Sequence, residues 1–314
     1  MNIKAPQRLS PAFKDYLWGG RRLVTEFNKK CDFDKVAESW ELSTHKDGSS
    51  VITGGELDGM LFRDYIEKYK DQVLGKNALA FDFFPILIKF IDAKDSLSIQ
   101  VHPDDEYALK TEGEYGKTEM WYILDCDEGA GLYYGFKHEI SKDEFLERIK
   151  NNTITEVLNR VEVKKGDVFF IEAGTVHAIG AGIVICEIQQ NSNTTYRVYD
   201  FDRRDKFGNA RELHIDKAAE VSTLAPVEKK SDFSDNETLA SCKYFTVKKA
   251  VVNGVKSFKT DALCFTSVIV TNGIGELKMD GYSFDLNKGD SIFIPAQDGE
   301  YTVSGECELI ISRV

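Results

Sequence analysis

The chain has 314 residues, a length that favours two domains over one compact core. Hydrophobic residues make up 42% and charged residues 29%, which is typical of a globular protein. The net charge of -12 argues against a general nucleic-acid partner or an anionic membrane surface, and an anionic small substrate would need a local basic pocket.

The N-terminal residues, MNIKAPQRLSPAFKDYLWGG, have no apolar core of the kind that a signal peptide needs. No run of ~18 apolar residues predicts a membrane span. The cysteines are scattered without a CxxC pair, and most lie in apolar runs. We interpret them as reduced thiols and expect a cytoplasmic protein without nucleic-acid or membrane partners.

Residues 1–60 are rich in Gly, Ser and aromatic residues, a texture that predicts short strands and loops. Two tryptophans lie beside turn residues in this segment, Trp18 in LWGG and Trp40 in AESWELSTH. Core packing is the favoured interpretation for Trp40.

Residues 58–74 carry apolar side chains at helical spacing, and Gly75 follows them. They predict a helix that ends at this glycine. Phe83–Ile91 is a continuous apolar run that only Lys89 interrupts. A lysine in such a run lies at a strand edge or faces a polar cavity.

The stretch from Leu97 to Trp121 holds three candidate metal ligands. Its start, LSIQV, reads as a strand, and side chains two residues apart in a strand leave the same face. Gln100 and His102 should therefore point the same way. Glu119 follows further along, with Lys117 on the same face if that segment is also a strand.

A fourth candidate ligand, His177, lies far downstream in GTVHAIG. Two histidines, one glutamate and one glutamine form a plausible shell of nitrogen and oxygen ligands for a divalent metal such as zinc. The oxygen-rich character also admits manganese, iron or cobalt. A single His or Gln on a strand is usually an ordinary polar residue, so the hypothesis depends on the whole set.

A capping box predicts a helix in the middle of the chain, because Ser141 is followed three residues later by Glu144. The sequence then changes to short strands with Gly turns, which is all-β patterning. Ile215–Leu224 predicts one short helix. The polar segment Glu228–Glu237 lacks apolar periodicity, so we expect a linker there.

An internal repeat joins Lys165–Ile171, KGDVFFI, to Lys288–Ile294, KGDSIFI. Each copy follows an alternating strand, which implies a duplicated β unit such as a jelly roll or small barrel. The first copy continues to His177, whereas the second has Glu300 at that place and no Q-x-H upstream. We expect one barrel to hold the metal and the other to be structural or regulatory.

Two further residues could complete a site. Glu187 lies on an apolar strand that ends in polar residues, downstream of the candidate histidine. Arg197 lies among aromatic residues and could form a buried structural ion pair or bind an anion, and the sequence favours neither. Asp104 and Asp105 are interpreted as solvated loop charges.

The segment Gly166–His177, GDVFFIEAGTVH, resembles the second cupin motif, although Glu172 replaces the usual proline and the Asn expected after the His is absent. The first cupin motif normally reads His-x-His, and here it reads Gln-Val-His. In having Gln in place of the first His, the chain resembles type I phosphomannose isomerases. Four further segments are also similar to that family: SIQVHPDD, KTEMWYIL, GTVHAIGAGIVICEIQQNSNTTYRVYDFDR and LWGG. The likeness runs from about Leu17 to His214 and is closest to the compact bacterial branch.

This resemblance implies a mainly β fold of two cupin-like jelly-roll barrels with a few short helices. Residues 1–228 would form the catalytic metal-binding domain, and 238–314 a C-terminal β domain without a metal site. It also implies one zinc ion per chain, with four ligands: Gln100, His102, Glu119 and His177. Catalytic roles would belong to Arg197, Glu187 and Lys117. Substrate contacts would come from Ser98 and Lys89 near the phosphate end, and from Trp18.

The family interconverts mannose 6-phosphate and fructose 6-phosphate, so the resemblance implies a hexose phosphate substrate. Such a reaction needs a base, stabilisation of the enediolate oxygens and exclusion of water. Either Glu187 or a metal-bound hydroxide would move the proton, while Lys117 and Arg197 would counter the developing charge. A cupin dioxygenase, a different sugar isomerase and a non-catalytic hexose-phosphate-binding protein remain open alternatives.

Overall fold

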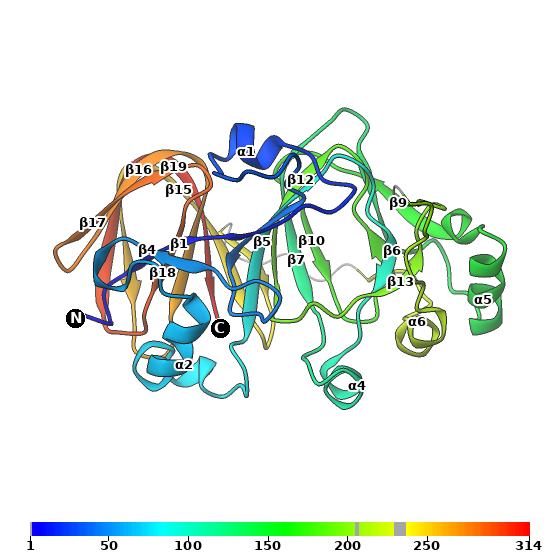
Figure 1. Ribbon diagram of the computed structural model, residues 1–314, viewed down its shortest axis with the longest axis horizontal. Helices are drawn as coiled ribbons and strands as arrows, with labels where there is room; N and C mark the ends of the chain where they lie inside the picture. Colours follow the sequence, from blue (N-terminus) through cyan, green and yellow to red (C-terminus); the bar gives the residue numbers. More distant parts are fainter. Residues whose placement is uncertain (1, 205–206, 229–236) are drawn as a thin grey trace. The chain divides into compact units, whose positions relative to one another are not determined.

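The computed structural model describes residues 2–204, 207–228 and 237–314. Contacts divide the chain into two compact units. The first comprises Met1–Asp15, Arg21–Phe90 and Phe233–Val314, and the second comprises Tyr16–Gly20 and Ile91–Asp232. One division falls inside a strand, β5 (Ile86–Ala93), which contributes residues to both units (Figure 1).

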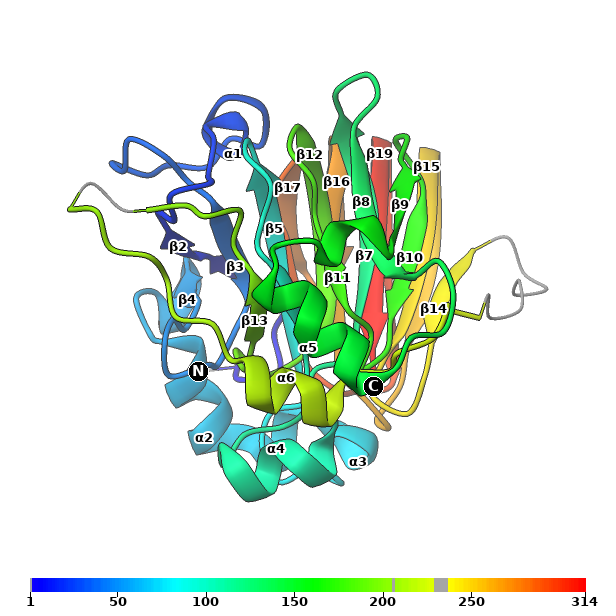
Figure 2. The ribbon, with the colours of Figure 1, turned by 90° about the vertical axis from the view of Figure 1, so that its right-hand side faces the viewer.

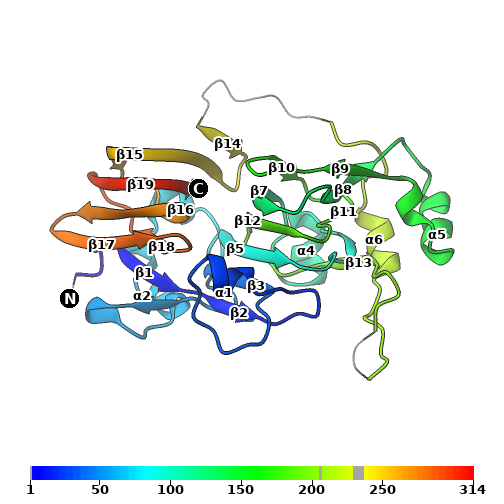
Figure 3. The same cartoon turned by 90° about the horizontal axis from the view of Figure 1, so that it is seen from above.

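The first unit contains an eight-stranded antiparallel sheet, whose long strands β15, β19 and β16 run side by side (Figure 3). Its order is β14-β15-β19-β16-β18-β1-β4, and β17 pairs with β16. The strands are β1 (Gln7–Ser10), β4 (Val51–Thr53), β14 (Thr238–Ser241), β15 (Thr246–Thr260), β16 (Thr266–Met279), β17 (Tyr282–Asn287), β18 (Ser291–Ile294) and β19 (Gly299–Arg313). Two more strands, β2 (Ala12–Lys14) and β3 (Glu38–Leu42), pair with each other.

Strand β1 explains why both ends of the chain belong to the first unit. It pairs with β18 through Arg8 and Ile292 and with β4 through Arg8 and Thr53. Each of the two units therefore consists of separate segments of the chain, and no single boundary in the sequence divides them. The division into residues 1–228 and 238–314 stays a prediction, and the linker expected at Glu228–Glu237 lies almost entirely outside the described residues.

The helices of the first unit are short, and the longest is α2 (Phe62–Val73). The predicted helix over residues 58–74 is thus confirmed with a later start, after the 3-10 turn η1 (Gly55–Leu57). Gly75 follows the end of α2 and, with a φ of +78°, begins a further short helix, α3 (Gly75–Ala78). A five-residue helix, α1 (Arg22–Glu26), was not predicted.

The second unit contains a five-stranded sheet of order β13-β6-β11-β8-β9, and in addition β7 pairs with β10 and β12. Its strands are β6 (Ile99–Val101), β7 (Glu119–Cys126), β8 (Gly131–Phe136), β9 (Leu158–Glu162), β10 (Val168–Ile171), β11 (His177–Ala178), β12 (Ile183–Gln190) and β13 (Tyr196–Tyr199). Its helices are α4 (Asp105–Thr111), α5 (Lys142–Lys150) and α6 (Ile215–Val221), with a 3-10 turn η2 (Ile154–Glu156).

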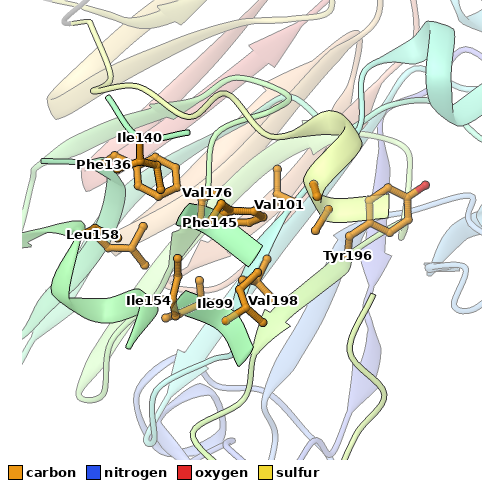
Figure 4. Packing of buried hydrophobic residues seen from close by; sticks show 14 of the residues in the cluster. Ile99, Val101, Phe136, Ile140, Phe145, Ile154, Leu158, Val176, Tyr196 and Val198 are labelled. Carbon is orange, nitrogen blue, oxygen red and sulfur yellow. The ribbon is translucent and has the colours of Figure 1, made fainter. Parts of the chain in front are cut away.

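One face of the five-stranded sheet is apolar and packs against α5 and α6 (Figure 2). Ile99 and Val101 of β6 contribute to this core together with Val198 of β13 and Phe145 of α5 (Figure 4). Because side chains alternate along a strand, the residues between them face the other way. This alternation aims Gln100 and Arg197 at the opposite, polar face of the sheet.

The predicted helix after Ser141 is confirmed as α5. The Ser141 hydroxyl accepts a hydrogen bond from the Glu144 backbone N–H at 3.1 Å, as an N-cap should. Helix α4 was missed. Asp104 caps it by accepting from the Tyr107 N–H at 2.9 Å, and Asp105 accepts from Gly116 N–H and from Gln190. Asp104 is exposed and lies before the helix, as expected of a solvated loop charge, but it also caps α4; the interpretation is wrong for Asp105, which is partly buried in the first turn of α4.

The internal repeat has a structural counterpart in each unit, since KGDVFFI forms β10 and KGDSIFI forms β18. The glycines that precede them, Gly166 and Gly289, have φ of +93° and +99°, a conformation that glycine adopts without steric cost. In both turns the next residue, Asp167 or Asp290, accepts from the backbone N–H three residues earlier, at 2.9 and 2.8 Å.

The mainly β class is confirmed, but two jelly-roll barrels are not. The described strands pair into open sheets, because β13 and β9 end one sheet and β14 and β4 end another. Sequence patterning predicts strands well but does not fix whether the outermost strands meet. Among the described residues, no helix is long and apolar enough to cross a membrane.

Candidate metal centre and active site

Three buried side chains of the second unit converge on one point. His102, Glu119 and His177 each offer a ligand atom, and these atoms lie within 4.8 Å of one another. Glu119 Oε1 is 3.3 Å from His177 Nε2 and 3.7 Å from His102 Nε2. All three side chains are at most 1% exposed. A carboxylate and two imidazoles buried together form a donor set that a divalent cation fits.

The strands bring these residues together from distant parts of the sequence. His177 begins β11 and lies directly opposite Gln100 of β6. His102 follows β6 immediately, and Glu119 begins β7. The Lys117 N–H donates to the Pro103 carbonyl at 3.0 Å, which ties the start of β7 to the turn after His102.

Backbone carbonyls orient both histidines. His102 Nδ1 lies 2.9 Å from the Thr194 carbonyl, and His177 Nδ1 lies 2.8 Å from the Thr175 carbonyl. A carbonyl only accepts, so each Nδ1 carries the proton and each Nε2 presents its lone pair toward Glu119. Burial lowers the pKa of His177 to about 4, and a neutral imidazole is the form that binds a metal.

Gln100 lies at the edge of this cluster, with Nε2 at 3.4 Å from His177 Nε2. An exchange of its amide oxygen and nitrogen by rotation would present an oxygen ligand. The structure therefore places all four predicted ligands together. The shell of two nitrogens and two oxygens fits zinc and related divalent ions, so metal identity is not decided by the donors.

Lys117 and Glu187 lie beside the cluster and are buried. Lys117 Nζ is 2.5 Å from Glu119 Oε2, 3.2 Å from His102 Nε2 and 3.7 Å from Glu187 Oε1. The Trp121 indole N–H donates to Glu187 Oε2 at 2.9 Å. One oxygen of Glu187 is thus fixed by the indole, while the other is directed toward the lysine.

Arg197 lies opposite Gln100 in the pairing of β13 with β6. Together with the His177–Gln100 pair, this register forms a polar row across the sheet. Arg197 Nη1 donates to the Glu212 carbonyl at 2.7 Å. Within the described part of the chain its Nε is buried and has no hydrogen-bond partner. The sequence alternative of a buried ion pair gains no support from these contacts.

The predicted substrate residues differ in their surroundings. Ser98 is buried and immediately precedes β6, the strand that carries Gln100. Trp18 is buried with its ring 5.7 Å from that of Tyr16. Lys89 belongs to the first unit, where its Nζ lies 3.4 Å from Glu38 Oε2.

Sequence reasoning missed several residues that support the site. Trp121 could have been found, because it follows Glu119 at the two-residue spacing of one strand face. Thr175 and Thr194 could not, since they act through backbone carbonyls that any residue carries.

Residues 7–128 match the family model of the phosphomannose isomerase type I catalytic domain, and 235–314 match that of the mannose-6-phosphate isomerase cupin domain. The mannose-6-phosphate isomerase ManA of Bacillus subtilis strain 168 is 38% identical, over 98% of this chain and 99% of its own length. The chain belongs to the type I phosphomannose isomerase family. The probable mannose-6-phosphate isomerase GmuF of the same strain is also 38% identical, over 98% of this chain and 99% of its own length. The crystal structure of the mannose 6-phosphate isomerase from Bacillus subtilis superimposes with a TM-score of 0.90 at 36% identity, covering 99% of this chain and 100% of that one.

Proposed function

We propose that this chain interconverts mannose 6-phosphate and fructose 6-phosphate in the cytoplasm, with one zinc ion per chain. The observation that carries the proposal is the buried His102–Glu119–His177 cluster with a second carboxylate, Glu187, and a lysine beside it. Full-length relatives with this activity in their names support the same substrate.

The metal would be held by His102, Glu119 and His177, with Gln100 as the fourth ligand. A divalent ion bound there would polarise the substrate's oxygens and stabilise negative charge on them. The shell supplies one negative charge, from Glu119, so a doubly charged cation would retain a net positive charge toward the substrate. Burial of the whole set strengthens that attraction, because little water is present to screen it.

Glu187 is the proposed base. Its Oε1 would take the proton from C2 of the open-chain aldose, while the C–H electrons form the C1–C2 double bond and the C1 carbonyl electrons move to its oxygen. The proton of the C2 hydroxyl then passes to the C1 oxygen, the C2–O electrons form the C2 carbonyl, and the electrons of the C1–C2 double bond take the proton back from Glu187 at C1, which gives the ketose. The indole of Trp121 holds the other carboxylate oxygen, so the base keeps its direction while it moves the proton.

Lys117 and Arg197 would stabilise the negative oxygens of the enediolate. Lys117 lies within 3.7 Å of both carboxylates and so reaches the region between the metal ligands and the base. Arg197 on β13 and His177 on β11 lie on either side of Gln100 on β6, on the same face of the sheet. Ser98 and Trp18 are proposed to contact the remainder of the substrate, and the role of Lys89, which belongs to the first unit, stays a prediction.

The C-terminal segment 238–314 is proposed to be the second cupin-like barrel and to bind no metal. Within residues 2–204, 207–228 and 237–314, the His102–Glu119–His177 set is the one group of His, Cys, Asp and Glu residues placed to hold an ion. Glu300, which occupies the histidine's place in the repeat, is exposed on β19 opposite Lys259.

The proposal is tested by removing and restoring the metal. The isolated protein is stripped with a chelator, and its conversion of mannose 6-phosphate to fructose 6-phosphate is assayed before and after addition of one equivalent of zinc. We expect activity to disappear on stripping and to return with zinc, and unphosphorylated mannose to be a poor substrate. Unchanged activity in the stripped protein would contradict metal dependence, and absence of fructose 6-phosphate in every sample would contradict the function.

A further inference from the structure

The outer edge of β13 is covered by the short segment that precedes α6. Among the described strands, β13 ends the five-stranded sheet, and the outward-facing backbone groups of such a strand have no partner within the sheet. His214 binds both of these groups in Arg197. The Arg197 N–H donates to His214 Nδ1 at 3.1 Å, and the His214 N–H donates to the Arg197 carbonyl at 2.8 Å. The Arg197 guanidinium also donates to the Glu212 carbonyl at 2.7 Å. We call these three hydrogen bonds the Arg197 clip.

The Arg197 clip requires the neutral form of the His214 ring. A backbone N–H only donates, so Nδ1 must be unprotonated in order to accept, and the ring proton lies on Nε2. Burial is the largest cause that lowers the pKa of His214, and the charge of Arg197 acts in the same direction. Lys217 also lowers this pKa, whereas Glu212 and Glu112 raise it. With its pKa below the ordinary value of 6.5, the ring is neutral near pH 7 and Nδ1 can accept.

His214 uses its side chain for this contact and not to cap α6. It is the N-cap residue of that helix, where the side chain of Ser, Thr, Asp or Asn normally accepts a hydrogen bond from the first turn. The His214 side chain makes no such bond and is directed at β13. Because histidine is not among the favoured N-cap residues, the needs of the helix do not explain this residue, whereas the bond to Arg197 does.

Helix α6 holds His214 in a fixed place. Ala218 and Ala219 of α6 are buried in the apolar cluster on one face of the sheet, which also contains Val198 of β13 (Figure 4). The His214 ring packs against Tyr196, with the two ring centroids 6.1 Å apart. The Arg197 clip is therefore anchored to the apolar core of the second unit.

The direction of the Arg197 side chain depends on the clip. The Asp200 carboxylate acts on Arg197 by its charge, but its hydrogen bonds go to Arg203 and Arg211. Arg197 Nε is buried and has no hydrogen-bond partner in the part of the chain that the structure describes. The clip therefore fixes the backbone from which this guanidinium projects and one of its nitrogens.

We propose that His214 is a positioning residue, which holds Arg197 in the orientation that stabilises the enediolate oxygens. This inference rests on the proposed function, because Arg197 is assigned a catalytic role only in that reaction. A donor that is already oriented needs no rearrangement when negative charge develops in the transition state. Loss of the clip should therefore lower kcat more than it raises KM. His214 acts through Arg197 and needs no contact with the substrate.

The test compares the zinc-loaded parent protein with His214→Leu and His214→Asn. Leucine removes the acceptor for the Arg197 N–H, whereas the amide oxygen of asparagine can take the place of Nδ1. His138→Leu is the control, because His138 is an exposed histidine of the same unit. For each protein we would measure kcat and KM for mannose 6-phosphate, the melting temperature, and hydrogen exchange of the Arg197 N–H by nuclear magnetic resonance.

We expect His214→Leu to speed exchange of the Arg197 N–H and to lower kcat by about tenfold, with KM within about threefold of the parent. His214→Asn should restore both the protection of this N–H and kcat, and His138→Leu should change neither. Across the variants, kcat should follow the protection of the Arg197 N–H. His214→Ala serves as a second variant if His214→Leu fails to fold.

A double variant shows whether the effect passes through Arg197. In an Arg197→Ala background, His214→Leu should lower kcat by less than about twofold, because the group that it positions is already absent. A further loss of about tenfold in that background would show a general structural role and overturn the inference. A His214 variant with an unprotected Arg197 N–H and the parent kcat would also overturn it, as would unchanged protection in His214→Leu. Protection that depends on residue 214 in a parent protein inactive on mannose 6-phosphate would support the clip and refute the proposed function.

Discussion

At the scale of single residues, the candidate metal centre depends on the contacts that orient each proposed ligand. The Nδ1 atoms of His102 and His177 are engaged by backbone carbonyls, so both Nε2 atoms point at Glu119. Replacing one imidazole removes a ligand without disturbing the apolar face of the sheet, which is built from the intervening residues.

His177→Ala should therefore lose most of its bound zinc while the fold persists. Three ligands from two strands and a turn hold a divalent ion much less tightly than four, and the buried cluster would also admit water. Metal content by atomic emission and secondary structure by circular dichroism report the two effects separately. A His177→Ala protein with one zinc per chain would exclude this histidine from the shell.

A single substitution of Arg197 can distinguish its possible roles. Its charge persists even when the group is buried, and its planar fork keeps a direction that lysine's ammonium does not. We expect Arg197→Lys to keep the metal and the fold and to lower kcat by about 10²-fold or more, as for loss of one stabilising donor.

Steady-state kinetics and a thermal melt separate the possible roles of Arg197. A rise in KM with nearly unchanged kcat would show that Arg197 binds the ground-state substrate only. A fall in melting temperature together with activity would show a structural role. Either result would remove Arg197 from the catalytic residues.

At the scale of secondary-structure elements, sequence patterns predicted the features that depend on contacts between residues close together in the chain. Ser141 and Glu144 predicted α5 because a cap needs contacts within one turn. The Q-x-H string predicted that Gln100 and His102 share a face because strand alternation is local. The contacts of Arg203 and Arg211 with Asp200 were not predicted, because no sequence periodicity relates these three residues.

Helix α5 provides an energetic test of this local account. Ser141→Ala removes the acceptor for the Glu144 N–H and should destabilise the second unit by about 1 kcal/mol. The melting temperature should fall by roughly 2–4 °C per kcal/mol for a unit of this size. Ser141→Gly is the control, because glycine at an N-cap costs only about a few tenths of a kcal/mol. Equal melting temperatures for all three proteins would show that the cap contributes nothing.

At the scale of the whole molecule, sequence patterns do not determine which distant strands pair or whether a sheet closes into a barrel. The repeat predicted a duplicated β unit, and its two copies have the same glycine conformation and the same aspartate hydrogen bond. It did not predict that β1 would join β18, because Arg8 and Ile292 are far apart in sequence and their pairing depends on the completed sheet. The expected barrels are not confirmed, because closure of a barrel depends on whether the edge strands of a sheet meet, which sequence patterns do not determine.

Removal of residues 240–314 should make the remaining chain insoluble. The deletion takes away the strand partner of β1 on one side, and it uncovers the buried rings of Phe62 and Phe84, which pack against Phe293 and Phe265. Exposed strand edges and apolar surface promote association. Size-exclusion chromatography of the soluble fraction tests this, and recovery of a monomeric, folded fragment would contradict it.

The central claim is that Glu187, beside a buried metal centre, moves the proton that converts mannose 6-phosphate to fructose 6-phosphate. The most direct measurement is the rate of fructose 6-phosphate formation by the zinc-loaded protein and by its Glu187→Gln variant, with zinc content determined in the same samples. Loss of a positioned general base should lower kcat by about 10²-fold or more while one zinc per chain is retained. A Glu187→Gln protein that keeps its zinc and forms fructose 6-phosphate at the parent rate would contradict the account.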